Sequence, residues 1–96
     1  MITGTTPEGF RYKIKDSVAR DYRLLRLASK ANNLSDEQAL TFAVDFPELV
    51  LGNEGLDQLI NFLTKKDGYP DSEKVFKITT WIFNNASKKS DELKNY

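Results

Sequence analysis

The chain has 96 residues, a net charge of zero and a hydrophobic content of 40%, which suit one domain with a single apolar core. It contains no histidine and no cysteine, so the most common general base, thiol nucleophiles and the usual zinc ligands are excluded. We therefore expect a protein that is not an enzyme and that uses no cofactor and no metal. Chemistry carried by carboxylates alone is the remaining catalytic alternative.

The first residues of the chain resemble neither a signal sequence nor a structured element. Residues 1–9 are small and polar, include Pro7 and Gly9, and have no basic start and no apolar run. They are predicted to be a flexible N-terminal tail. No apolar stretch reaches the roughly 18 residues that a membrane span needs, so we expect no membrane association and a location in the cytoplasm.

Residues 10–14 alternate apolar and basic side chains, which is typical of a half-buried strand. A single strand needs a partner, so it either pairs with another copy of the chain or lies extended across the helices. A first helix is predicted from Ser17 or Asp21, either of which can cap it, to about Ala31. Its basic side chains share one face. They are Arg20, Arg23, Arg26 and Lys30.

A second helix is predicted over residues 36–51, with Ser35 and Gln38 forming a capping box and Gly52 ending it. Pro47 lies inside this stretch and predicts a kink or a restart. The helix is apolar around more than half of its circumference, so it is either central to the domain or shared with a partner. The residues expected to contact that partner are Phe42, Phe46, Leu49 and Val50.

Two further helices are predicted, from residue 53 or 54 to 66 and from 71 or 72 to about 87, joined by a turn. Residues 88–96 are charged and polar and are predicted to be a frayed C-terminal tail. The sequence therefore predicts an all-α or α-dominated fold of about four helices, with one short N-terminal extended strand. The helical domain is expected to cover residues 10–87.

The charges are separated along the chain. Residues 11–30 hold half of the basic residues, whereas residues 31–63 contain acidic residues and no basic one. Opposed blocks can pair within the fold or with the opposite block of a neighbouring copy. Together with the wide apolar face over residues 36–51, this pattern favours an interaction protein that forms homo-oligomers.

The order of these landmarks resembles the tail assembly chaperones of long-tailed bacteriophages with non-contractile tails and of related prophages. The resemblance covers roughly residues 10–95. The segments that carry it are residues 10–14, Asp21-Tyr22-Arg23-Leu24-Leu25, Leu49-Val50-Leu51-Gly52, Leu56 with Leu59, Lys66-Asp67-Gly68, Ile82-Phe83 and Leu93-Lys94-Asn95. The family is commonly more acidic in the first helix, where this chain carries its basic row.

The resemblance implies a small helical protein made in two forms through a programmed ribosomal frameshift. Both forms bind the tape measure protein, a very long helical protein that would otherwise aggregate. The extended form also recruits tail tube protein subunits. The chaperones act in the cytoplasm of the bacterial host and are absent from the mature virion. No catalytic residue is implied.

Two alternative functions are suggested by the basic face of the first helix and by the small size of the chain. The basic row could contact nucleic-acid phosphates, but a balanced net charge does not favour nucleic acid as a partner. The interpretation without a binding role is that the same row is a solvated helix face. A small regulatory protein, such as an antitoxin or antirepressor, is the further alternative.

Overall fold

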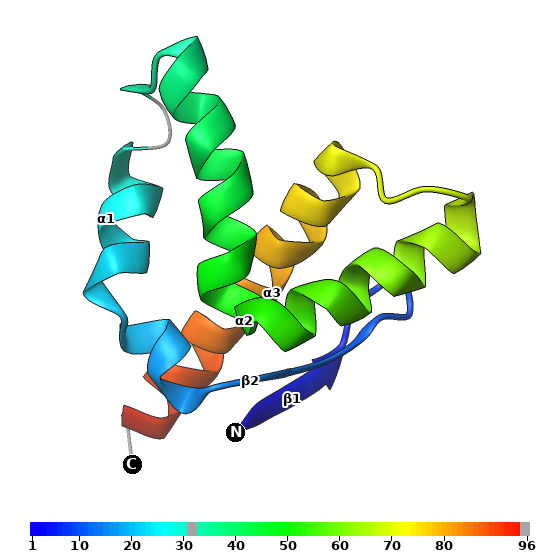
Figure 1. The fold of residues 1–96 in the computed structure, drawn as a ribbon. Coiled ribbons are helices and arrows are strands. Elements are labelled where there is room, and N and C mark those ends of the chain that lie inside the picture. Colours follow the sequence, from blue (N-terminus) through cyan, green and yellow to red (C-terminus); the bar gives the residue numbers. More distant parts are fainter. Residues whose placement is uncertain (31–32, 95–96) are drawn as a thin grey trace.

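The structure, a computed structural model, describes residues 1–30 and 33–94, with side chains described up to residue 88. Three α-helices, one short 3-10 helix and a two-stranded sheet make up this part of the chain (Figure 1). In chain order they are β1 (Ile2–Thr5), β2 (Arg11–Ile14), η1 (Asp16–Arg20), α1 (Tyr22–Lys30), α2 (Asp36–Asp67) and α3 (Ser72–Lys94).

The N-terminal residues form a β-hairpin, so the prediction of a flexible tail over residues 1–9 is wrong. Strand β1 pairs antiparallel with β2, which gives the predicted strand a partner within its own chain. In the turn, the Gly9 amide donates to the Thr6 carbonyl and the Thr6 amide donates to the Phe10 carbonyl, each at 2.9 Å. Pro7 suits the second position of this turn, and Gly9 takes the left-handed conformation with φ 97°.

A glycine lets a tyrosine ring lie across the hairpin. Gly4 is the register partner of Tyr12. A Cβ atom at Gly4 would lie 2.5 Å from the Tyr12 hydroxyl oxygen, so no larger residue fits without movement. The Tyr12 hydroxyl accepts a hydrogen bond from Asn85 Nδ2 at 3.0 Å, and its ring meets Trp81 edge-on. The ring therefore joins the hairpin to α3.

Side chains cap all three α-helices, as the sequence predicts. Asp21 caps α1, because its Oδ1 accepts from the Arg23 amide at 2.9 Å. Ser35 and Gln38 form the predicted capping box of α2 through two reciprocal hydrogen bonds. Asp71 caps α3 through the Lys74 amide. The sequence left Ser17 and Asp21 open as caps of the first helix and residues 71 and 72 open as the start of the last. The residues that cap these helices are Asp21 and Asp71.

The predicted count of four helices is corrected to three α-helices within residues 1–30 and 33–94, because two predicted helices belong to α2. The two halves of α2, residues 36–51 and 53–67, run in different directions (Figure 1). The non-helical residue is Gly52, with φ 74° and ψ 169°, and not Pro47. Glycine adopts this conformation at little cost, so the bend falls there. Helix α3 continues to Lys94, beyond its predicted end at Ser87.

The core lies where α2, α3 and the hairpin meet. A cluster of aromatic rings joins the first half of α2 to α3: Phe42 stacks on Phe46 at 5.1 Å between centroids, and Phe76 meets Phe42 at 5.3 Å. Phe83 meets Phe46 at 5.6 Å. Helix α1 is attached more lightly, since Leu24 is its one buried residue.

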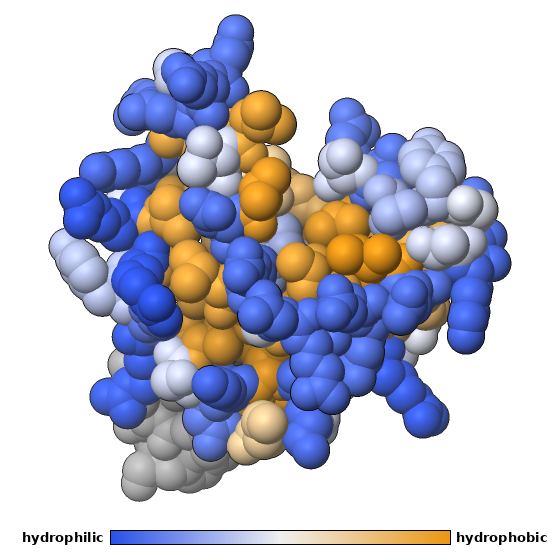
Figure 2. Space-filling view, in the orientation of Figure 1, coloured by the Kyte–Doolittle hydropathy of each residue, from blue (hydrophilic) through white to orange (hydrophobic). Residues whose placement is uncertain are grey.

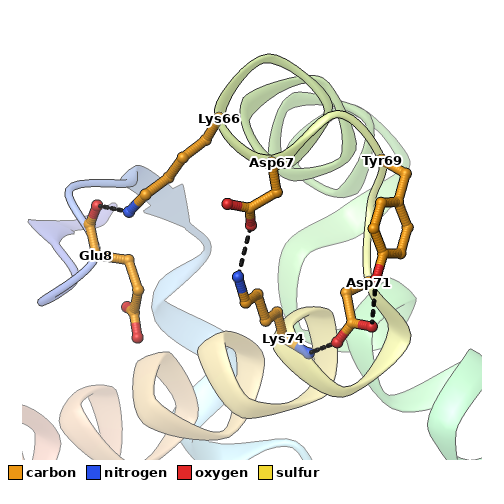
Figure 3. Close-up of polar contacts among 6 residues, drawn as sticks. All are labelled: Glu8, Lys66, Asp67, Tyr69, Asp71 and Lys74. Carbon is orange, nitrogen blue, oxygen red and sulfur yellow. Dashed lines mark hydrogen bonds and ion pairs between the residues drawn. The ribbon is translucent and has the colours of Figure 1, made fainter.

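Polar contacts close the end of the molecule at the α2–α3 turn (Figure 3). Lys66 Nζ donates to the Glu8 carbonyl at 2.9 Å and ties the hairpin turn to α2. Lys74 pairs with Asp67 at 2.7 Å, and this hydrogen bond raises the pKa of Lys74. The Tyr69 hydroxyl approaches Asp71 at 3.5 Å. The first two contacts join neighbouring elements, and the third lies within the turn itself.

Candidate functional site

An open groove of about 940 Å³ is lined by α1, η1, the end of the hairpin and α2 on both sides of its bend. In Figure 2, apolar side chains are visible between the hydrophilic side chains of α1 and those of the first half of α2. Among the groove residues, Leu27 of α1 and Leu49 of α2 are partly buried, so part of each side chain is accessible. Val18, Val50 and Leu51 are buried beneath them. The groove therefore has an apolar floor.

Opposite charges line two sides of this groove. The basic wall comes from the N-terminal part of the chain and consists of Lys13, Lys15 and Arg23, with the acidic Asp21 paired to Arg23 beside them. The acidic wall belongs entirely to α2 and consists of Asp45, Glu48 and Glu54. All six side chains are exposed. The two charge blocks of the sequence thus face the same groove.

No ion pair crosses the groove within the described residues. The three ion pairs found there join Met1 to Asp16, Arg23 to Asp21, and Lys74 to Asp67. An ion pair across the groove would need one residue from each wall. None of the six wall residues pairs with a residue of the opposite wall. Among the described residues, Lys13, Lys15 and the three acidic residues of the other wall form no ion pair and can pair with a bound partner, whereas Arg23 is already paired with Asp21.

Arg23 is held at the edge of the groove by its own helix cap. Its Nη2 lies 2.7 Å from Asp21 Oδ2, and its Nε donates to Asp21 Oδ1 at 3.1 Å. The hydrogen bond from the Arg23 side chain lowers the pKa of Asp21, and the same contact raises the pKa of Arg23. This bidentate arrangement orients the guanidinium group while leaving it exposed.

Three of the four residues predicted to face a partner from α2 instead face the core. Phe42, Phe46 and Val50 are buried against the rest of the chain, so their placement on an outward face is wrong. Leu49 does reach the surface, in the floor of the groove. The exposed apolar residues of α2 are Leu40 and Val44, which are 69% and 61% exposed. Their spacing of four residues places both on one helix face, but the buried pair Phe42 and Phe46 has the same spacing, so spacing alone could not identify them.

The four basic residues of the predicted row are all exposed but do not form one helix face. Arg20 belongs to η1, whereas Arg23, Arg26 and Lys30 belong to α1. Of these four, Arg23 lines the groove. Lys13 and Lys15 complete the basic wall, and sequence analysis did not single them out. The alternation of Lys13 with buried Tyr12 and Ile14 places Lys13 on the outer face of β2, and Lys15 follows directly after that strand.

The described part of the chain holds no group of three acidic, histidine or cysteine residues that could bind a metal ion. It also contains no helix that is long and apolar enough to cross a membrane. Comparisons of the chain with protein-family models, with curated proteins and with solved structures find no match. The groove and the exposed apolar residues are therefore the features of the described chain that bear on its function.

Proposed function

We propose that this protein is an assembly chaperone that binds a helical segment of a client protein. The observation that carries the proposal is the groove, which combines an apolar floor with two oppositely charged walls. Such a surface suits a protein partner, because apolar burial supplies affinity and charge complementarity supplies specificity. Leu40 and Val44 add exposed apolar area on α2 that the core does not use.

The client that we propose is a phage tape measure protein, as the resemblance to tail assembly chaperones implies. A frameshifted, extended form would recruit tail tube protein, and both forms would act in the cytoplasm of the bacterial host and leave before the virion matures. Self-association into homo-oligomers belongs to the same proposal. A very long helical client presents many amphipathic segments, so repeated copies of one small chaperone can cover it.

Co-expression with the tape measure protein encoded in the same genome tests this function. We expect the tape measure protein to move from the insoluble to the soluble fraction and to co-purify with the chain. An unrelated long coiled-coil protein serves as the control client and should not co-purify. A tape measure protein that stays insoluble and unbound in the presence of excess chain would contradict the proposal.

The second candidate function is nucleic-acid binding or regulation through the basic side chains of η1 and α1. The observation in its favour is that Arg20, Arg23, Arg26 and Lys30 are all exposed. The acidic wall of α2 argues against it, since Asp45 and Glu48 would repel phosphates approaching the same groove. Retardation of labelled DNA or RNA that disappears with added salt would support this alternative over the chaperone function.

A further inference from the structure

We infer that the groove takes an amphipathic helix with a two-sided charge pattern. One flank of that helix is acidic and lies on the basic wall, the other is basic and lies on the acidic wall, and an apolar stripe lies between them. This inference depends on the proposed function for the identity of the client. The chemistry of the bound segment, in contrast, follows from the groove alone.

The floor of the groove favours a helix over an extended peptide. The groove is also lined by the polar residues Ser17, Asn53 and Gln58, but Leu27 and Leu49 offer no hydrogen bonds to a peptide backbone. A segment whose apolar side lies on these leucines keeps its own amides and carbonyls paired best as an α-helix, which satisfies them internally.

The size of the groove fits a short piece of helix. A groove of about 940 Å³ in a molecule whose longest extent is 44 Å can contact only a few turns of a helix that is about 10 Å wide. Two turns present about one apolar stripe of three or four residues. The groove therefore recognises a local segment and not the whole length of a client.

The walls determine which helices are accepted. The basic wall of Lys13, Lys15 and Arg23 requires an acidic flank, and the acidic wall of Asp45, Glu48 and Glu54 requires a basic one. A helix with one sign of charge on both flanks meets like charge on one side. Nucleic acid, which carries only negative charge, would meet the same repulsion from the acidic wall. Because the two flanks of a helix exchange sides when its direction is reversed, the charge pattern also selects the direction of the bound chain.

Synthetic helical peptides test the inference without a natural client. The probe is a fluorescent, stapled peptide of about 16 residues with an apolar stripe, three glutamates on one flank and three lysines on the other. Its control has the same composition with the charges mixed on both flanks. We expect fluorescence anisotropy to give about tenfold weaker binding for the mixed peptide at low salt, because each exposed charge pair contributes modestly. The difference should shrink at high salt.

Charge reversal in the protein identifies the walls. Glu48→Lys should weaken the binding of the two-sided peptide several-fold. A peptide whose lysine flank is replaced by glutamates should bind better to this variant than to the wild type. Glu73→Lys, the same reversal at an exposed position outside the groove, is the matched control and should change neither affinity. Circular dichroism checks that each variant keeps its helices.

Equal affinity for the two-sided and mixed peptides, or no rescue of Glu48→Lys, would overturn the inference. These results differ from a failure of the proposed function. If the tape measure protein does not co-purify while the two-sided peptide binds selectively, the inference about the groove is confirmed and the proposed client is wrong. If the client co-purifies equally with the wild type and with Glu48→Lys, and the peptide shows no selectivity, the client binds elsewhere.

Discussion

Gly4 is the residue on which the close contact between the hairpin and α3 depends. The Tyr12 ring occupies the space that a side chain at Gly4 would need, and it also accepts the hydrogen bond from Asn85. Tyr12 is only 4% exposed, so its ring has little room to move aside. A glycine opposite an aromatic residue in a sheet is therefore a packing requirement at this position and not a source of flexibility.

Replacing Gly4 by alanine should destabilise the protein by about 1 to 3 kcal/mol, because the new methyl group overpacks a buried site. Chemical denaturation measures the change in the free energy of unfolding. Thr5→Ala is the neighbouring control on the exposed side of β1 and should cost less. In a Tyr12→Leu background the cost of Gly4→Ala should fall. An undiminished cost there would show that the contact with the ring is not the cause.

At the scale of the elements, the bend in α2 decides how the molecule is arranged. It lets the first half of the helix pack on α3 through Phe42 and Phe46, while the second half lies along the hairpin and contributes Leu59 and Leu63 to the core. The conformation of Gly52 lies in a region that is open essentially to glycine alone. A methyl group there would meet no neighbouring atom within 4 Å, so backbone strain is the obstacle.

Gly52→Ala should therefore destabilise the protein by about 1 to 3 kcal/mol, measured by chemical denaturation. Gly68 provides the matched control, because it caps α2 in the left-handed helical region with φ 90° and ψ −16°. Asparagine tolerates that region, so Gly68→Asn should cost about 1 kcal/mol or less. At Gly52 asparagine should be no better tolerated than alanine. Equal costs at both glycines for both residues would contradict this explanation of the bend.

At the scale of the whole molecule, the apolar surface of α2 is divided between the core and the outside. Phe46 is 3% exposed, whereas Leu40 and Val44 remain largely open to solvent. Exposed apolar residues of this kind are normal when single, but a pair on one helix face can contribute to association. We therefore expect the chain to self-associate at high concentration through the face that carries Leu40 and Val44.

Substitution of both exposed residues by serine separates association from folding. Leu40→Ser with Val44→Ser should change the free energy of unfolding by less than about 1 kcal/mol, but should lower the mass measured by light scattering at low salt. Phe46→Ala should instead cost about 3 to 5 kcal/mol, because it leaves a cavity in the aromatic cluster. A doubly substituted chain that scatters light as strongly as the wild type would contradict a role for this face in association.

Local features of the sequence determined the helix caps, the alternation of β2 and the breaks between helices. Ser35 with Gln38, Asp21, Asp71 and Gly68 act through backbone groups a few residues away, so their roles could be predicted without the rest of the fold. The hairpin over residues 2–14 was missed, although Pro7-Glu8-Gly9 beside an alternating strand is a turn signal.

Only the tertiary structure decided which side of α2 became the core and which charges stayed unpaired. Phe42 and Val44 lie two positions apart on a helix that is apolar over more than half of its surface, so periodicity could not rank them. The groove likewise needs α1, β2 and α2 to meet, and it brings Lys13 and Glu48 to one site from distant parts of the chain. Such contacts depend on packing between elements, which neighbouring residues along the chain do not encode.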